Sequence, residues 1–343
     1  MIRFFFTLIG LLFFITTLAL FFISAGAALG FIHPILDVFN HLQPLIFIGT
    51  LSLLLLSPVF IKNKKWQSIN IAIAATGFIS SAAIVVPEFV LGLSVEKSEI
   101  TADTKQYKLL SQNLFGLNYD MQRIAEAIKK EDPDIIALQE YFSTQRAGLH
   151  PLLVKDYPYY FLCIGGKRAN IAIYSKLKFE KLAASDCAKD RKERTSRIFI
   201  KIIDDDFTVA TTHFDWPVRI SQFRKGNDFS EKLDLAFARK KGQLSEFAKA
   251  LENINGPLLI GADFNSTSWS YELRNFAKDN GLKLLTRSLL TYPNKFNIFG
   301  WRDVFPFISL DHIMSKGEIK IYELRKGDAA GSDHNPVIIR FSV

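Results

Sequence analysis

Apolar residues are unevenly distributed along this sequence of 343 residues, and that distribution limits the folds open to it. From Met1 to about Leu93 there is almost no charge, whereas the composition after Ser94 is that of an ordinary soluble domain. The first part holds apolar runs long enough to cross a bilayer, which argues against the buried helical core of a soluble domain. We therefore expect a membrane anchor, residues 1–93, followed by a soluble part.

The anchor is predicted to contain three transmembrane helices, at about residues 4–27, 44–61 and 69–91. The first run follows Arg3 and ends in small residues, which is also typical of a cleaved signal peptide. It is too long for the apolar region of a signal peptide, however, and two further apolar segments follow it. We therefore expect the first run to be retained as a span.

Basic residues beside the spans predict their orientation. Arg3 precedes the first span, and Lys62, Lys64 and Lys65 lie between the second and the third, whereas His33–Gln43 has no Lys or Arg. The positive-inside rule then places the N-terminus and the lysine-rich loop in the cytoplasm. Three crossings put the soluble part outside the cytoplasm, as in a multi-pass protein of a bacterial-type plasma (inner) membrane with a periplasmic domain.

The soluble part is interpreted as a linker, residues 94–105, and one domain, residues 106–343. Predicted strands cover Gln106–Gln112, Asp134–Leu138, Tyr159–Cys163, Asn170–Tyr174, Arg197–Ile203, Phe207–Thr211, Leu258–Ile260, Ser309–Met314, Ile319–Leu324 and Pro336–Phe341. Helices are predicted between a cap at Asn118 and a stop at Asp132-Pro133, from about Val218 to Asn253, and over Tyr271–Asn280. This mixture indicates an α/β (α+β) fold of paired sheets flanked by helices.

Polar side chains that suit phosphate chemistry follow several of the predicted strands. Hydrolysis of a phosphoester needs a cation on the phosphoryl oxygen, a positioned water and donors for the developing charge. The candidates are Asn113, Glu140, His213, Asp263, Asn265, Asp311, Asp333 and His334. Singly, each has an ordinary alternative, such as a solvent-exposed strand end, a polar turn or a core histidine. Together they predict metal-assisted phosphoester hydrolysis.

The metal and water-activating roles are assigned from chemistry. Glu140 is the best metal ligand, because an isolated carboxylate at the end of a buried run is costly unless a cation or a hydrogen bond compensates it. Asn113 can bind the metal or hydrogen-bond a ligating carboxylate. Asp263 and Asn265 lie two residues apart in an extended stretch and can face one phosphate together, the aspartate activating water.

Two Asp-His dipeptides occur near strand ends in the last part of the sequence. Because adjacent strand residues point to opposite faces, each aspartate should pair with a histidine elsewhere in the sequence. We expect Asp311 to orient His334, which would stay charged and stabilise the transition state, and Asp333 to face the metal. His312 is then structural.

Three further predictions concern the surroundings of the site. His213 is expected to be a second phosphate donor or acid. Arg168 and Asn170 are candidate substrate-binding residues, or belong to an ordinary turn. Cys163 and Cys187 lie on the side assigned as oxidising, where a disulfide between them is expected; two unrelated thiols are the alternative.

The net charge of +8 raises the question of nucleic acid as a partner. The basic clusters Lys189–Arg194 and Arg239–Lys241 have no stacking aromatic residues interleaved with them, so a DNA-binding stripe is not favoured. Cytoplasmic lysines and attraction to anionic lipid headgroups account for the charge equally well.

The order of these motifs resembles the endonuclease/exonuclease/phosphatase superfamily, which includes deoxyribonuclease I, over roughly Tyr107–Val343. The matching motifs are Ser111–Asn113, Leu138–Glu140, Thr212-His213, Gly261–Asn265, Leu310–His312 and Ser332–His334. The resemblance implies a four-layer α/β/β/α sandwich and a Mg²⁺ or Mn²⁺ site. It places Glu140, Asn113 and Asp333 at the metal, Asp263 on the water, Asn265 on the phosphate, Asp311 and His334 as a charge-stabilising pair, and His213 as the other active-site histidine.

Three spans before such a domain look like the VanJ-type membrane phosphatases linked to teicoplanin resistance, although Tyr292-Pro293 stands where Trp-Pro is expected. The sequence thus predicts a membrane-anchored, divalent-metal-dependent phosphohydrolase acting outside the cytoplasm. The expected partners are the lipid bilayer and a phosphorylated substrate, which could be a lipid-linked phosphate or pyrophosphate. The alternatives are an extracytoplasmic nuclease or phosphodiesterase, for which nucleic acid is the partner, and a non-catalytic membrane-tethered binding domain.

Overall fold

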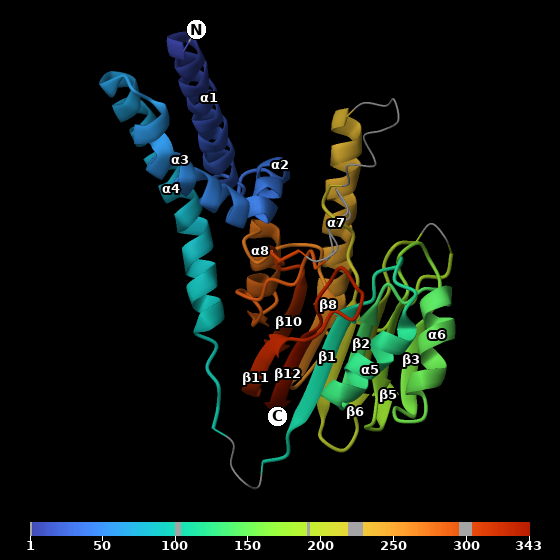
Figure 1. Ribbon diagram of the computed structural model, residues 1–343. Coiled ribbons are helices and arrows are strands. Elements are labelled where there is room, and N and C mark those ends of the chain that lie inside the picture. The colour runs from blue at the N-terminus through green and yellow to red at the C-terminus, as the bar shows by residue number, and fades with distance from the viewer. Residues whose placement is uncertain (1, 100–103, 191–192, 219–228, 295–303) are drawn as a thin grey trace. The chain divides into compact units, whose positions relative to one another are not determined.

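Figure 1 shows a computed structural model of the chain, which describes residues 2–99, 104–190, 193–218, 229–294 and 304–343. The chain forms two compact units. The helical unit comprises Met1–Leu91 together with Trp269–Arg274, and the sandwich unit comprises Gly92–Ser268 and Asn275–Val343. Within the predicted linker, residues 100–103 lie outside the described residues.

Three long apolar helices make up most of the helical unit, and each has the length and composition to cross a membrane. They are α1 (Ile2–Ala28), α3 (Gln43–Phe60) and α4 (Lys64–Leu93). A short helix, α2 (Pro34–Asp37), and a 3₁₀ turn, η1 (Val38–Leu42), connect α1 to α3. The prediction of three apolar helices near the N-terminus is confirmed.

Small and polar side chains join the helices of this unit. Ser24 Oγ in α1 donates a hydrogen bond of 2.6 Å to the carbonyl of Gly77 in α4, and Asn70 Nδ2 in α4 lies 3.1 Å from Ser57 Oγ in α3. A Cβ atom at Gly77 would lie 3.3 Å from the Cα of Phe21, so the absence of a side chain lets α1 and α4 approach closely. Such contacts are typical of helices that pack inside a membrane.

Two six-stranded sheets form the sandwich unit. The first has the order β11-β12-β1-β2-β4-β3, with β1 (Tyr107–Asn113), β2 (Ile135–Gln139), β3 (Tyr159–Cys163), β4 (Ile171–Ser175), β11 (Lys320–Lys326) and β12 (Val337–Ser342). The second has the order β5-β6-β7-β8-β10-β9, with β5 (Phe179–Lys181), β6 (Arg197–Ile202), β7 (Phe207–Thr212), β8 (Leu258–Asp263), β9 (Lys283–Leu284) and β10 (Asp311–Lys316). All predicted strands are present with small shifts at their ends, whereas β5 and β9 are additional.

The core lies between the two sheets, where alternate side chains of both sheets are buried against each other. Leu109 and Ile173 from the first sheet pack in one cluster with Val209 and Leu259 from the second. Toward one end of the sheets, polar contacts replace apolar ones: Gln139 Nε2 of β2 donates to Thr211 Oγ1 of β7 at 2.9 Å. The functional side chains described below follow the same strand ends.

Helices cover the outer faces of the two sheets, as seen for α5 and α6 in Figure 1. Those on the first sheet are α5 (Met121–Glu131) and α6 (Ser143–Leu153), and those on the second are α7 (Phe229–Leu251) and α8 (Tyr271–Asp279). On the first sheet, Leu110 and Ile136 pack against Ile124, Ile128 and Leu149. The predicted fold class, an α/β/β/α sandwich with three preceding apolar helices, is confirmed.

Two details of the predicted helices are wrong. The cap of α5 is Asp120, whose side chain accepts the N–H of Arg123 at 3.1 Å, whereas Asn118 lies outside the helix and accepts the N–H of Asp120. Helix α6 was not expected, because its sequence has no clear 3.6-residue pattern. Of the helix predicted from Val218, residues 219–228 lie outside the described residues.

Candidate active site

Parallel pairing brings the ends of four strands to one end of the sandwich. β1 pairs in parallel with β2, and β7 with β8. Asn113 closes β1, Glu140 follows β2, His213 follows β7 and Asp263 closes β8. Asp311, the first residue of the antiparallel strand β10, stands opposite Asp263 in the ladder. Five buried side chains that are distant in the sequence therefore meet.

Asp263 is held by amide donors on both of its oxygens. Its Oδ1 accepts the backbone N–H of Asn265 at 2.8 Å, and its Oδ2 accepts Asn113 Nδ2 at 2.8 Å. His213 Nε2 lies 3.4 Å from the same Oδ2. These contacts fix the orientation of the carboxylate in the site.

His213 and Asn265 form a second connected pair. Asn265 has a left-handed backbone, with φ of 48°, so the chain turns sharply after β8. Its Nδ2 donates to the carbonyl of Phe214 at 2.8 Å and lies 3.1 Å from His213 Nε2. His213 Nδ1 lies 3.0 Å from the carbonyl of Arg168. Because a carbonyl only accepts, Nδ1 carries the hydrogen and Nε2 faces the other site residues.

Glu140 is turned into the site by a left-handed backbone conformation, with φ of 52° directly after β2. Its Oε2 accepts the N–H of Gly116 at 2.7 Å. Its Oε1 lies 3.3 Å from the guanidinium of Arg168 and 3.9 Å from His213 Nε2. The side chain is only 8% exposed, so the alternative of a solvent-exposed strand end does not hold.

His334 is hydrogen-bonded to Asp311, with 2.8 Å between Nδ1 and Oδ2. Burial disfavours charge on the ring, but the carboxylates of Asp311 and Asp263 outweigh it and raise the pKa of His334 to about 10. The ring is therefore charged at neutral pH. Tyr292 packs on it with 4.8 Å between ring centroids, and Trp216 lies edge-on to Tyr292 at 5.8 Å. Burial raises the pKa of Tyr292 to about 12, so its hydroxyl is neutral.

His312 takes no part in this arrangement. Its Nε2 donates to the carbonyl of Ser266 at 2.8 Å, and its Nδ1 lies 2.9 Å from Thr286 Oγ1. Burial lowers the pKa of His312 to about 4. A neutral ring with both nitrogens hydrogen-bonded in this way is typical of a core residue. Because side chains alternate along β10, His312 points to the opposite face from Asp311.

Asp333 lies in the loop before β12, where its carboxyl group is buried near other carboxylates. Burial raises its pKa to about 6, and the charges of Glu140 and Asp263 add to this effect, although the charged ring of His334 opposes it. Its Oδ1 is buried and has no hydrogen-bond partner among the described residues. The ionised carboxylate needs a compensating charge at this place.

The donor set of the site fits a divalent cation. The Oδ1 atoms of Asn265, Asp311 and Asp333 are all buried without a partner in the part of the chain that is described. Carboxylate and amide oxygens are the ligands that Mg²⁺ and Mn²⁺ prefer. Unsatisfied oxygens in a buried site with several carboxylates are stabilised by a bound cation.

Two sets of residues compete as the ligands. Ligand atoms of Asp263, Asp311 and His334 lie within 4.8 Å of one another. Their closeness reflects the hydrogen bond between Asp311 and His334, however, and a charged imidazole offers no lone pair to a metal. The carboxylates of Glu140 and Asp333 are the better candidates, because each lies 3.9 Å from a histidine nitrogen, beyond hydrogen-bond distance.

The predicted substrate-binding residues differ in how they are placed. The Arg168 side chain is 37% exposed and reaches Glu140 from the edge of the site. The Asn170 side chain bonds to both the N–H and the carbonyl of Gly165, at 3.3 and 3.1 Å. Asn170 thus closes a turn, which was the alternative interpretation, and its role in substrate binding stays a prediction.

Cys163, at the end of β3, and Cys187 form a disulfide. The alternative of two unrelated thiols therefore does not apply to this structure. The bridge closes the segment that contains Arg168 and Asn170, and so restrains one side of the site.

Lys240 in α7 is a site neighbour that the sequence analysis missed. It is 1% exposed, its Nζ donates to the carbonyl of Phe264, and it lies 5.0 Å from the ring centroid of Phe214. It supports the chain between the two site residues Asp263 and Asn265. A signal was present, because Lys240 occupies an apolar position of the helix, four residues before the buried Leu244.

Each of the two basic clusters contains an arginine that is paired with Asp215. Arg194 binds Asp215 with both Nε and Nη2, at 2.5 and 2.8 Å. Arg239 lies 3.7 Å from the same carboxylate. Lys240 is buried, whereas Lys189 and Lys241 are exposed and residues 191–192 lie outside the described residues.

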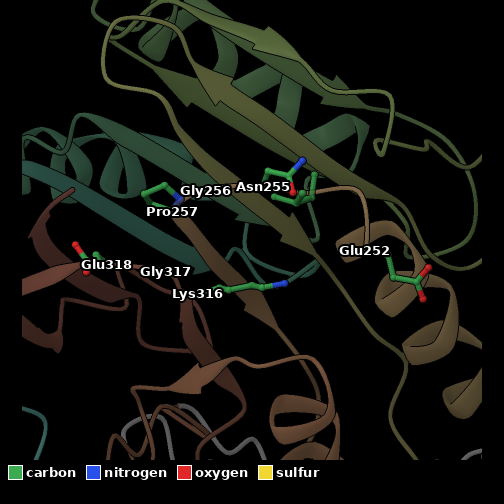
Figure 2. Close-up of a pocket in the computed structure, with 8 residues that line it drawn as sticks. Glu252, Asn255, Gly256, Pro257, Lys316, Gly317 and Glu318 are labelled. Atoms are coloured by element: carbon green, nitrogen blue, oxygen red, sulfur yellow. The ribbon is translucent and has the colours of Figure 1, made fainter.

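A pocket elsewhere on the sandwich unit contains none of the predicted site residues. It is lined by Gly256 and Pro257 before β8, Lys316 and Gly317 at the end of β10, and nearby residues (Figure 2). These positions lie at the ends of β8 and β10 opposite to Asp263 and Asp311. The pocket is thus separate from the candidate active site.

Comparison with known proteins agrees with the fold. The profile described as the Endonuclease/Exonuclease/phosphatase family matches residues 110–334. A protein of that description from Beutenbergia cavernae DSM 12333 is similar with a TM-score of 0.51 and 14% identity, over 70% of this chain and 72% of that chain. One from Bacteroides vulgatus is similar with a TM-score of 0.50 and 17% identity, over 70% and 99%. No curated protein matches the sequence significantly.

Proposed function

Because this chain belongs to the endonuclease/exonuclease/phosphatase family, whose members hydrolyse phosphoester bonds, we propose that it is a phosphohydrolase dependent on Mg²⁺ or Mn²⁺. The observation that carries the proposal is the meeting of Asn113, Glu140, Asp263 and the Asp311–His334 pair at one end of the sandwich. Hydrolysis of a phosphoester uses each of them.

The roles follow from the contacts. A bound cation, held by Glu140 and Asp333 with Asn113 nearby, would neutralise charge on the phosphoryl oxygen. Asp263, oriented through both oxygens, takes the proton of the attacking water. His334 presents a charged ring with its Nδ1–H on Asp311, which leaves Nε2–H to donate to the developing charge.

Further groups hold the phosphate. Asn265 and His213 lie against each other and bracket the carboxylate of Asp263, so both reach a phosphoryl oxygen placed there. Arg168 enters from the exposed edge and supplies a second positive charge. Binding and proton transfer are thereby assigned to different side chains.

We place the catalytic part outside the cytoplasm, anchored by three spans as in the VanJ-type subgroup. The three apolar helices and the basic residues beside them support this orientation. The disulfide supports it too, because such bonds persist mainly in oxidising compartments. A fluorescent protein fused at the C-terminus that matures only in the cytoplasm tests it, since a bright fusion contradicts the orientation.

The substrate class that we favour is a lipid-linked phosphate or pyrophosphate. An enzyme tethered to a membrane meets substrates of that membrane at a high effective concentration. One arginine in each basic cluster, Arg194 and Arg239, is paired with Asp215, which reduces the charge that these two residues offer to nucleic acid. Purified full-length protein with Mg²⁺ should release phosphate from polyprenyl pyrophosphate and leave plasmid DNA intact; nicking of plasmid alone would reverse this assignment.

The hydrolase proposal itself is tested on a panel of small phosphomonoesters, phosphodiesters and pyrophosphates. We expect turnover that a chelator abolishes and Mg²⁺ or Mn²⁺ restores. Asp263→Asn should lower kcat roughly 10²- to 10⁴-fold, the range for loss of a general base, and the exposed Asp234→Asn is the matched control. Full activity of Asp263→Asn, or turnover in chelator, refutes the proposal.

A further inference from the structure

The anchor contains only two acidic residues, Asp37 and Glu88, among its first 93 positions. Both are buried, at 6% and 4% exposure. Carboxylates within membrane helices are costly and are kept where specific partners compensate them. Both carboxylates bond to the same short segment, Trp269–Arg274, which belongs to the helical unit.

Asp37 caps the start of α8. Its Oδ1 accepts the backbone N–H of Tyr271 at 2.8 Å, and its Oδ2 accepts the N–H of Glu272 at 3.0 Å and the hydroxyl of Ser270 at 3.1 Å. The first N–H groups of a helix have no partner inside the helix and favour a negative charge. A residue more than two hundred positions earlier in the chain therefore caps the helix together with the neighbouring Ser270, whose Oγ accepts the N–H of Leu273 at 3.3 Å.

Glu88 and Tyr271 make further contacts between α8 and the membrane helices. Arg274 Nη1 lies 3.2 Å from Glu88 Oε1 and its guanidinium stacks on the ring of Tyr271 at 4.3 Å. The hydroxyl of Tyr271 donates to the carbonyl of Ala28 at 3.1 Å. The first turn of α8 is thus fixed to α1, α2 and α4 through hydrogen bonds and side chains of opposite charge.

Asp37 is itself anchored by a chain of polar side chains. Asn40 Nδ2 donates to Asp37 Oδ1 at 2.8 Å, Gln43 Nε2 donates to Asn40 Oδ1 at 2.8 Å, and Ser81 Oγ donates to Gln43 Oε1 at 2.6 Å. These residues come from η1, α3 and α4. Contacts within the membrane helices therefore orient the carboxylate of Asp37 independently of its bonds to α8.

Trp269, the first residue of this segment, follows Asn265 after only three buried residues, Ser266–Ser268. We propose that Asp37 and Glu88 are positioning residues, through which the membrane helices hold the far end of the loop that carries Asp263 and Asn265. The inference rests on the proposed function for the meaning of that loop. It makes the anchor part of the catalytic apparatus in addition to a tether.

The test uses the full chain in lipid nanodiscs and two readouts. Amide hydrogen exchange follows the segment Phe264–Arg274, and steady-state kinetics follow a small water-soluble phosphoester. In Asp37→Ala we expect exchange in this segment to rise roughly tenfold or more, with protection of β1 and β2 unchanged. We expect kcat to fall roughly tenfold or more, as for a small displacement of reacting groups, while KM stays within about twofold. The matched control is Ser80→Ala, a half-buried residue of α4 whose hydroxyl donates to the carbonyl of Thr76 in the same helix.

A second set of variants decides the matter if Asp37→Ala unfolds. Glu88→Gln, Arg274→Gln and the double variant should all lower kcat, with the double variant no worse than the worse single. The inference is overturned if the losses of kcat in Glu88→Gln and Arg274→Gln add up in the double variant. It is also overturned if Asp37→Ala has the amide exchange and the kcat of the wild-type protein. If the wild-type protein hydrolyses nothing in the panel, the proposed function fails, while exchange in Phe264–Arg274 still decides whether Asp37 holds the loop.

Discussion

Loss of the disulfide between Cys163 and Cys187 should weaken both the stability of the sandwich unit and its site. The bridge links residues separated by 24 positions. Within that loop the carbonyl of Arg168 accepts from His213, and its guanidinium lies on Glu140. Breaking the bridge therefore frees a segment that orients two site residues.

The magnitude follows from the length of the closed loop. The chain-entropy relation for a separation of 24 gives about 3.4 kcal/mol of stabilisation at 25 °C. A unit of this size shifts its midpoint by about 2–4 °C for each kcal/mol. We therefore expect the thermal midpoint of the sandwich unit to fall by about 7–14 °C when the bridge is absent.

The assay compares thermal unfolding of three forms of the full chain: oxidised wild type, reduced wild type, and the variant Cys163→Ala/Cys187→Ala. Reduced wild type keeps both side chains, so it separates the effect of the bridge from that of the lost sulfur atoms. Reduction should also lower kcat, because Arg168 and His213 lose their fixed geometry. Equal midpoints for oxidised and reduced protein would refute the reasoning, as would the finding of two free thiols in the native oxidised protein.

Three further outcomes are expected. Asp311→Asn should lower kcat by roughly 10²-fold with little change in the fold, because His334 loses the partner that keeps it charged and oriented. Steady-state kinetics give kcat and circular dichroism reports the fold; a wild-type kcat would contradict the assigned role. Lys240→Met should lower the free energy of unfolding by about 1–3 kcal/mol, since the carbonyl of Phe264 loses a buried donor. The control Lys241→Met, at an exposed position, should change that free energy by no more than about 0.5 kcal/mol. Equal effects of the two substitutions in denaturant titrations argue against the buried contact. Mg²⁺ or Mn²⁺ at about 100 times its Kd should raise the free energy of unfolding by about 2.7 kcal/mol in a chelator-reversible way, and no shift with either ion speaks against a metal site.

Much of the sandwich was predictable, because its strands carry local signals. Asp134–Leu138 is a short apolar run bounded by polar residues, and it corresponds to the buried strand β2. Residues at the ends of such strands could be grouped before their contacts were known, since parallel neighbours such as β1 and β2 end at the same side. Helix α6 escaped prediction because it contains Gly148 and Pro151, which weaken a helical pattern and are tolerated only by tertiary packing.

The geometry inside the site was less predictable, because it depends on backbone conformations without a sequence signal. Glu140 and Asn265 both have positive φ angles. For residues other than glycine this conformation is uncommon and is sustained by the surrounding structure. The sequence predicts that Asp263 and Asn265 share a face because the backbone between them is extended. In the structure the turn at Asn265 brings them together, and the N–H of Asn265 donates a hydrogen bond to the carboxylate of Asp263.

Three charged residues out of keeping with their apolar surroundings have a common explanation. Lys240 interrupts the apolar face of α7, and Asp37 and Glu88 are the two acidic residues of a mostly apolar anchor; each is buried. A buried charge costs several kcal/mol unless it is paired or hydrogen-bonded. All three partners fall in one stretch of eleven residues, Phe264–Arg274, which begins directly after Asp263. Sequence periodicity shows that such a charge is misplaced but not what it binds, because the partner is set by tertiary structure. That these misplaced charges gather on this loop, and not at random over the fold, indicates that its position is what they maintain.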